Sequence, residues 1–333
     1  MYNIVRKDKK LKDYTFIDLF AGIGGFHYAF SSYGAECVFA SEWDKPASEV
    51  YYLNHKLKPE GDITLIDERL IPEHDILCGG FPCQAFSVSG KQKGFQDTRG
   101  TLFFDIARII EHHEPKVLLL ENVRNLLRHD DGNTMSTILK TLNDLGYDVH
   151  YKVLNTSNYG LPQNRQRIYI VGFRKDLNIE EFTFPEPLSK KTSLFDFLED
   201  NPSNVKIVER EDINIYKEPK LYDNLFETNV LPNKPIQIGK VNKGGQGDRI
   251  YHPVGHAITL SAYGGGVGAK TGLYKTNNGI RKLSPRECAN IQGFPKKFQF
   301  HTRDNQSYKQ FGNSVSINVL QKIIEEIIIS LKL

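Results

Sequence analysis

The chain has 333 residues, of which 39% are hydrophobic and 25% are charged. These values are typical of a globular protein with a core of ordinary size, and the length predicts one large domain or two smaller ones. No apolar stretch approaches the ~20 residues of a membrane span, and the basic N-terminus has no apolar signal segment, so we expect no membrane association and no secretion. Four cysteines without zinc spacing predict neither a disulfide framework nor a metal site, and fit the reduced cytoplasm.

Positive charge is concentrated in one part of the chain. Residues 234–286 hold nine basic side chains and one acid, a net charge of +8 that leaves −5 for the rest of a chain whose total is +3. A cationic segment on an otherwise acidic protein favours a polyanionic partner such as nucleic acid. The alternative at this point is a solvated, loop-rich face.

In chain order, the first half alternates short apolar runs with helical patterns. The predicted strands are 15–20, 36–41, 75–81, 116–122, 150–155 and 167–173. The predicted helices lie near 25–32, 46–55, 102–113 and 134–145. This alternation predicts an α/β fold with a doubly wound, mostly parallel sheet that is covered on both faces.

The alternation stops near residue 180, which predicts a second, smaller domain. Residues 181–235 are rich in Pro, Asn, Asp and Glu, and residues 236–282 are so rich in glycine that we expect loops on short strands and no helix. Residues 314–333 have helical periodicity and are expected to return to the first domain. We therefore divide the chain into an α/β domain (1–195), a glycine-rich domain with its connector (196–284), a hinge (285–312) and a C-terminal helix (313–333), with a cleft between the two domains.

The first chemical motif lies between the first predicted strand and helix. There Gly22, Gly24 and Gly25 form a turn that lets backbone N–H groups approach a ligand. Glu42, twenty residues after Gly22, ends the second strand, where an acid can bind ribose hydroxyls. The G-x-G-G spacing favours a single-nucleoside cofactor such as S-adenosylmethionine over a dinucleotide. Trp43 then stacks on an adenine or, alternatively, is a packing aromatic.

Three further motifs follow strand ends or precede a strand. Cys83, held between Pro82 and Gln84, is interpreted as a presented thiol, whereas Cys78 is expected to be structural. Glu121 is a carboxylate at the end of an apolar strand, where burial is costly without a function. Arg165 and Arg167 are spaced to point to one side of an extended chain and clamp one anion. In isolation, Glu121 and the arginines are more typical of surface ion pairs.

Taken in order, the motifs resemble those of the DNA (cytosine-5)-methyltransferase family. The resemblance runs from residue 16 to 320 through DLFAGIGG, PCQ, ENV, QNRQR, RKLSPRE and GNSV, and includes KGGQGDRIY and AITLSAYGGG. It implies that Cys83 is the nucleophile, that Glu121 holds the cytosine ring, and that Arg165 and Arg167 position the base and Cys83. The cofactor, S-adenosylmethionine, is expected to contact Phe20, Ala21, Gly22, Gly24, Gly25, Glu42, Trp43, Asp62, Ile63, Pro82, Leu102, Asn313 and Ser314.

The resemblance also implies double-stranded DNA as the substrate, with the target cytosine flipped out of the helix. Ser89 and Gln246 are expected to fill the vacated space, Arg249 to contact a guanine, and Thr259 a phosphate. The full set of expected DNA contacts is Ser87, Ser89, Lys91, Arg99, Gln246, Arg249, Thr259 and Tyr263. Asp248 stands where the resemblance leads us to expect Glu, and residues 252–256 also differ.

The resulting hypothesis is a bacterial, cytoplasmic modification methyltransferase that acts on the first cytosine inside GCGC, associated with the nucleoid while acting. We expect a monomer without an obligate protein partner. The alternatives are the same reaction on another DNA sequence, RNA (tRNA) cytosine-5 methylation, a nicotinamide oxidoreductase with a reactive cysteine, and an inactive DNA-binding module. The absent G-x-G-x-x-G and the intact Pro-Cys and Glu-Asn-Val weigh against the last two.

Overall fold

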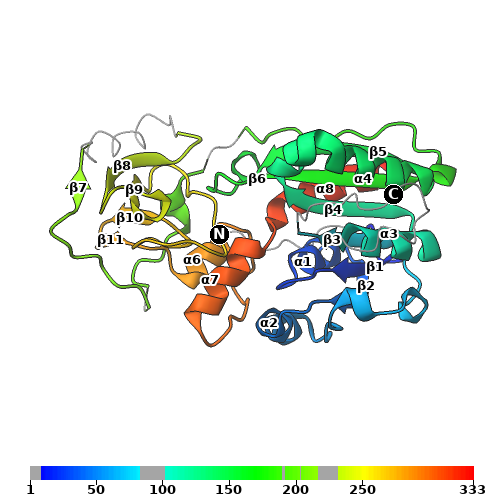
Figure 1. Ribbon diagram of the computed structural model, residues 1–333, viewed down its shortest axis with the longest axis horizontal. Helices are drawn as coiled ribbons and strands as arrows, with labels where there is room; N and C mark the ends of the chain where they lie inside the picture. The colour runs from blue at the N-terminus through cyan, green and yellow to red at the C-terminus, as the bar shows by residue number, and fades with distance from the viewer. Residues whose placement is uncertain (1–8, 83–101, 190–191, 203, 217–231) are drawn as a thin grey trace. The chain divides into compact units, whose positions relative to one another are not determined.

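The computed structural model describes residues 9–82, 102–189, 192–202, 204–216 and 232–333 (Figure 1). The chain forms two compact units. The α/β unit comprises Val5–Leu154, Gln166–Pro185 and Leu320–Leu333, and the glycine-rich unit contains Asn155–Arg165 and Glu186–Val319. No helix in the described part of the chain has the length and apolar character that crossing a bilayer requires.

The α/β unit is built on a six-stranded sheet with the order β2-β1-β3-β4-β6-β5. Its strands are β1 (Thr15–Leu19), β2 (Glu36–Ser41), β3 (Ile76–Gly80), β4 (Val117–Val123), β5 (Tyr147–Asn155) and β6 (Gln166–Arg174). Its helices are α1 (Gly25–Ser31), α2 (Lys45–His55), α3 (Leu102–His113), α4 (Asn133–Asp144) and α8 (Ile317–Ser330). Every strand and helix predicted for this part of the sequence is therefore present.

The sheet is mostly parallel, as predicted, with an exception at β6. Strands β2, β1, β3 and β4 pair in parallel, whereas β6 pairs with β4 antiparallel, Glu121 opposite Tyr169. The cause is the connection between β5 and its neighbour β6, residues 156–165, which is shorter than the dozen or more residues of a parallel crossover. The chain turns back there, and Arg165 and Arg167 lie at the start of the returning strand.

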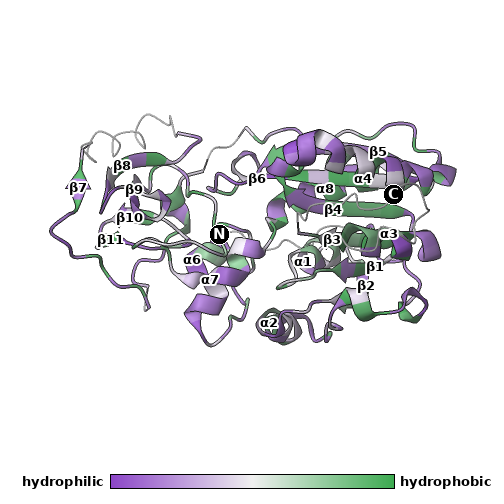
Figure 2. Ribbon diagram, in the orientation of Figure 1, coloured by the Kyte–Doolittle hydropathy of each residue, from purple (hydrophilic) through white to green (hydrophobic). Residues whose placement is uncertain are grey.

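Helices cover both faces of this sheet because successive strand residues point to opposite sides. Phe16 contacts Phe30 of α1, with ring centroids 5.2 Å apart, whereas Ile17 belongs to the buried cluster that includes Phe103 and Ile106 of α3. Helix α8 lies on the α1 side, since the Gln321 carbonyl accepts a hydrogen bond from the Tyr33 hydroxyl (2.9 Å). The hydropathy colouring shows the apolar character of β4, which has helices on either side (Figure 2).

The glycine-rich unit contains a five-stranded sheet with the order β11-β10-β9-β8-β7. Its strands are β7 (Asn214–Ile215), β8 (Ile236–Lys240), β9 (Arg249–His252), β10 (Leu273–Thr276) and β11 (Gly279–Arg281). Helices α6 (Pro285–Asn290) and α7 (Asp304–Asn313) follow. The expectation of short strands and loops over 236–282 is met, with one correction: Gln246–Asp248 form a short 3-10 turn.

A buried ion pair explains the RKLSPRE motif within this unit. The guanidinium of Arg281, 2% exposed, donates to both carboxylate oxygens of Glu287 at 2.8 Å. The same carboxylate accepts the backbone N–H groups of Ser284 (2.7 Å) and Glu199 (2.8 Å). The motif therefore fixes the start of α6 to the connector before it, a structural function.

Candidate active site

The loop between β1 and α1 has an unusual backbone. Phe20, Gly22 and Gly24 all have positive φ, at 55°, 56° and 83°. A Cβ atom on Gly24 would lie 2.1 Å from Nε2 of His55, so only glycine fits there. Phe20 is not a glycine, and residues held in this region cost about 1–3 kcal/mol each. Strain of this kind persists where the surrounding structure and function require a particular backbone path.

Glu42 at the end of β2 holds this loop in place. Its Oε2 accepts the N–H of Gly22 (2.8 Å), and its Oε1 accepts the N–H of Asp44 (2.7 Å). The carboxylate therefore joins the glycine turn to the start of α2, and a carboxylate oxygen can accept more than one hydrogen bond. The sequence predicted the ligand contact but not these two backbone contacts.

Trp43 is 77% exposed, so the alternative of a packing aromatic is wrong. Its ring face is available to a planar ligand beside the Glu42 carboxylate. The backbone beside Trp43 pairs with the segment that contains Asp62, because Glu42 donates its N–H to the carbonyl of Glu60 (2.9 Å). Asp62 caps a short 3-10 turn by accepting from Thr64 (3.0 Å), while Ile63 is buried.

The remaining residues predicted to contact a cofactor fall in different places. Ala21 is buried, Gly25 begins α1, Pro82 is exposed, and Leu102 begins α3. Asn313 and Ser314 belong to the glycine-rich unit, at the end of α7. An open aromatic face, a carboxylate and a glycine turn with left-handed backbone fit a nucleoside cofactor.

The adjacent ends of β3 and β4 form the second part of the site. Gly80 pairs with Glu121 in register, and the Asn122 side chain donates to the carbonyl of Phe81 (2.9 Å). The sequence analysis gave Asn122 no role, although its place in the Glu-Asn-Val motif could have indicated one. It fixes the chain just before Pro82. Cys83 itself lies outside the described residues.

Glu121 is 7% exposed and forms an ion pair with Arg167, whose Nε lies 3.1 Å from Oε1. The pair spans neighbouring strands, since Arg167 lies opposite Val123 in the β4–β6 ladder. A buried carboxylate with a guanidinium beside it is held in one orientation. This places one acid–cation pair at the strand ends that also carry the Pro82 segment.

Arg165 has carbonyl partners within the glycine-rich unit. Its buried guanidinium donates to the carbonyls of Leu260 (3.4 Å), Gly312 (3.3 Å) and Ser314. Arg165 lies just before β6, which begins at Gln166. These contacts join the segment of Arg165 to those of Leu260 and Gly312–Ser314.

A buried polar cluster lies beneath the glycine turn. The rings of His27 and His55 stack with centroids 3.8 Å apart, and Nδ1 of His27 lies 2.8 Å from the Tyr51 hydroxyl. Burial lowers the pKa of His27 to about 4 and is the main cause that lowers the pKa of His55 to about 2. Burial likewise raises the pKa of Asp18 well above its ordinary value. Both rings are therefore neutral at physiological pH.

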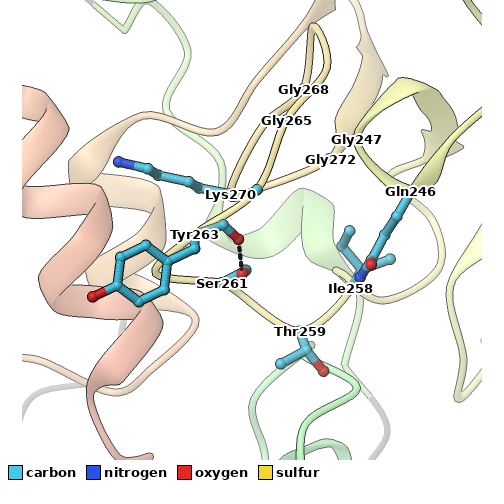
Figure 3. A pocket seen from close by; sticks show the side chains of 11 residues that line it. Gln246, Gly247, Ile258, Thr259, Ser261, Tyr263, Gly265, Gly268, Lys270 and Gly272 are labelled. Carbon is cyan, nitrogen blue, oxygen red and sulfur yellow. Dashed lines mark hydrogen bonds between the residues drawn. The ribbon is translucent and has the colours of Figure 1, made fainter.

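The glycine-rich unit carries a cavity of about 190 Å³ (Figure 3). This is below the ~300–1,000 Å³ of pockets that enclose small-molecule ligands. Gln246 and Ile258 both line it, and in this view the Tyr263 and Lys270 side chains are directed away from Gln246. Tyr263 is 73% exposed, and Arg249 is exposed on the strand that follows Gln246. Gln246 and Tyr263 thus line one cavity, and Arg249 is exposed three residues after Gln246.

Thr259 also lines this cavity, but its hydroxyl donates to the carbonyl of Asn164 (2.6 Å). A phosphate oxygen accepts hydrogen bonds only, so this hydroxyl meets a phosphate only by giving up Asn164. The predicted contacts Ser87, Ser89, Lys91 and Arg99 lie outside the described residues. Across the part of the chain that is described, no three His, Cys, Asp or Glu side chains are grouped to hold a metal ion.

A doubly wound sheet with a glycine turn after its first strand and an acid after its second is the architecture of enzymes that use nucleoside cofactors. Comparison with known proteins identifies the class more closely. The model of the family described as C-5 cytosine-specific DNA methylase matches residues 14–329. The Type II methyltransferase M.HhaI of Haemophilus parahaemolyticus is 54% identical over 95% of each chain. M.HpaII of Haemophilus parainfluenzae is 43% identical over 94% of this chain and 90% of its own.

Solved structures agree at the level of the fold. Dnmt2 methyltransferase of S. pombe has a TM-score of 0.67 at 20% identity, over 95% of this chain and 98% of its own. A putative DNA modification methyltransferase from an E. coli prophage has a TM-score of 0.69 at 21% identity, over 96% of this chain and 100% of its own. The chain belongs to the C-5 cytosine-specific DNA methylase family. Its activity is DNA cytosine-5 methylation, and its methyl donor is S-adenosylmethionine.

Proposed function

We propose that the protein methylates the first cytosine inside GCGC in double-stranded DNA, as the modification enzyme of a type II restriction–modification system. The observation that supports the target is 54% identity to M.HhaI, together with the cavity lined by Gln246 and Tyr263 and the exposed Arg249 that follows Gln246 in the glycine-rich unit. The α/β unit is proposed to be catalytic and the glycine-rich unit to recognise the target. We further propose a monomer acting on DNA in the bacterial cytoplasm.

Cofactor binding is assigned to the β1–α1 turn and the end of β2. Glu42 and the exposed Trp43 ring would hold the nucleoside, with the Phe20–Gly24 backbone and the Asp62 segment around it. When bound, S-adenosylmethionine supplies an electrophilic methyl group. Asn313 and Ser314 are proposed as further contacts on the basis of the GNSV motif.

The chemistry at the base is assigned to Cys83 and Glu121. The Cys83 thiolate adds to carbon 6 of cytosine, which makes carbon 5 nucleophilic. Glu121 holds a proton at ring nitrogen 3 and accepts from the exocyclic amine, which relieves the negative charge created by the addition. Once carbon 5 carries the methyl group, loss of the carbon 5 proton and elimination of the Cys83 thiolate restore the ring. Support for Glu121 comes from its burial and from its pairing beside Gly80.

The arginines are assigned separate functions. Arg167 orients the Glu121 carboxylate through the 3.1 Å ion pair. Arg165, whose described partners are backbone carbonyls, holds the segments of Leu260, Gly312 and Ser314 in register and positions the base and Cys83 through them. Substitution of Arg167 is therefore expected to change the methylation rate, and substitution of Arg165 to change folding of the glycine-rich unit as well.

Target reading is assigned to the surface around the cavity. Gln246 pairs with the guanine left without a partner when the cytosine is flipped out. Arg249 donates two hydrogen bonds to a guanine in the major groove, a contact worth about 1–3 kcal/mol of discrimination. Ser89 is proposed to enter the vacated space, while Ser87, Lys91, Arg99, Thr259 and Tyr263 contact the backbone or neighbouring bases.

Bisulfite sequencing of a plasmid from cells that express the protein tests the target directly. We expect protection of the first cytosine in every GCGC site and of no other cytosine. A parallel incubation with tritiated S-adenosylmethionine and either duplex DNA or tRNA should label only the DNA. Protection of a different sequence contradicts the GCGC target, and labelling of tRNA in place of duplex DNA contradicts the substrate.

The catalytic assignment is tested by two substitutions that preserve size. Cys83→Ser should abolish methyl transfer and leave cofactor binding within a few-fold of the wild type, because a hydroxyl is a much weaker nucleophile at neutral pH. Glu121→Gln should lower the single-turnover rate by about 10²–10⁴-fold with little change in DNA affinity. Turnover by Cys83→Ser above a few per cent of wild type, or an unchanged single-turnover rate for Glu121→Gln, removes that residue from the mechanism.

A further inference from the structure

Two glycine loops of the glycine-rich unit, residues 243–248 (first loop) and 264–268 (second loop), are in direct backbone contact. The N–H of Gly268 donates to the carbonyl of Gly247 (2.6 Å). A Cβ atom on Gly247 would lie 2.0 Å from the carbonyl oxygen of Gly265, so the two backbones approach more closely than any side chain permits. Gly247 of the first loop is therefore needed for loop–loop packing.

Asp248 connects the two loops through its side chain. Its Oδ1 accepts the N–H of Val267 in the second loop (3.0 Å). The residue is fixed by its own backbone, since its N–H donates to Gly245 (2.9 Å) and its carbonyl accepts from Val241 (2.8 Å). Gly266, with φ of +90°, passes so close that a Cβ atom there would lie 2.6 Å from Oδ1. The carboxylate is thus directed into the second loop.

The position of Asp248 links this contact to target recognition. It lies between Gln246 and Arg249, the two residues proposed above to contact guanines. The second loop contributes Gly264, Gly265 and Gly268 to the same cavity that Gln246 lines. A change in the distance between the loops therefore moves Gln246 relative to the opposite wall of the cavity.

We propose that Asp248 is a positioning residue for target specificity, which sets the spacing of the two loops by holding the Val267 N–H and thereby fixes where Gln246 and Arg249 meet the bases. This inference rests on the proposed function, in which those two residues read the target. It differs from direct reading, in which an aspartate accepts a hydrogen bond from the amino group of a cytosine. It also gives the Asp248 departure noted in the sequence a structural meaning.

The two mechanisms predict different behaviour of Asp248→Asn and Asp248→Ala. An asparagine keeps the size and an acceptor oxygen for Val267, so discrimination between the target and single-base variants should stay within about threefold of the wild type. Alanine removes the acceptor, and the ratio of kcat/KM values for target and variant duplexes should fall by about tenfold or more at every position read by the first loop. Flipping of the target base, measured by the fluorescence of 2-aminopurine at the target position, should become less favourable in the same variant.

Asp212→Asn is the matched control, because Asp212 also accepts a backbone N–H in this unit, that of Asn242 (2.9 Å), but its described hydrogen bonds go to Arg210 and Asn242 and not to the second loop. It should leave discrimination unchanged. Thermal unfolding and cofactor affinity of all three variants separate a loss of specificity from a loss of folding. The ratio is measured for whichever sequence the wild type methylates, so an unexpected target leaves this test intact.

Two results would overturn the proposal. If folded Asp248→Ala retains discrimination within twofold of the wild type, the loop contact does not set specificity. If Asp248→Asn is as damaging as Asp248→Ala and relaxes preference at a single base pair only, the carboxylate reads that base pair directly.

Discussion

Replacing Glu42 by glutamine probes how the cofactor turn is held. The carboxylate accepts the N–H groups of Gly22 (2.8 Å) and Asp44 (2.7 Å), one on each oxygen. Glutamine has a single carbonyl oxygen, so one of the two N–H groups must face its NH₂ group instead. Loss of one hydrogen bond to a charged acceptor costs about 1.5–3 kcal/mol. If the lost hydrogen-bond energy destabilises the cofactor-bound state alone, the dissociation constant for S-adenosylmethionine rises by about 10- to 100-fold.

The structure also offers the assay. Trp43 is the only tryptophan of the chain and is 77% exposed, so quenching of its fluorescence should report cofactor binding. Calorimetric titration provides a second measurement that is independent of the neighbouring substitution. Glu36→Gln, at the exposed opposite end of β2, is the control and should bind as the wild type does. A Glu42→Gln dissociation constant within twofold of this control would refute the idea that the carboxylate organises the turn.

Two further predictions concern stability. Arg281→Met leaves the buried Glu287 carboxylate without its cation, so it should lower the free energy of unfolding by about 3–5 kcal/mol in urea titrations. Lys332→Met breaks only the exposed pair with Glu180 and should change the free energy of unfolding by less than about 1 kcal/mol. Equal effects of the two substitutions would contradict the reasoning. In the folded state burial lowers the pKa of His27 to about 4, whereas in the unfolded chain the imidazole binds a proton near pH 6.5. The free energy of unfolding should therefore fall as the pH drops from about 6.5 to 4, by about 3 kcal/mol for this group. His27→Gln should flatten that dependence and the exposed His112→Gln should not; a His27→Gln profile as steep as the wild type would assign the loss to other groups.

Local pattern was enough to predict the strands and helices of the α/β unit, because apolar runs and helical periodicity are properties of neighbouring residues. The direction of β6 was not predictable from its composition, since it depends on the length of the connection after Asn155. The positive φ of Phe20 could not be predicted either, because phenylalanine has no preference for a left-handed backbone. The sequence singled out the motif residues but did not show what they contact: Glu42 accepts two backbone N–H groups, and Arg281 pairs with a buried glutamate.

In the QNRQR motif, two arginines that are close in sequence have contacts in different parts of the fold. The boundary between the two compact units falls between Arg165 and Gln166. On one side of it, Arg165 is fixed by carbonyls of the glycine-rich unit. On the other, Arg167 pairs with Glu121 inside the α/β unit. The described partners of the two guanidinium groups differ in kind: Arg165 donates to three carbonyls, whereas Arg167 lies beside one carboxylate. A planar guanidinium can direct several N–H groups at separate acceptors, whereas a lysine ammonium is a compact point charge. We therefore infer that a lysine replaces Arg167 better than it replaces Arg165 with its three carbonyl partners.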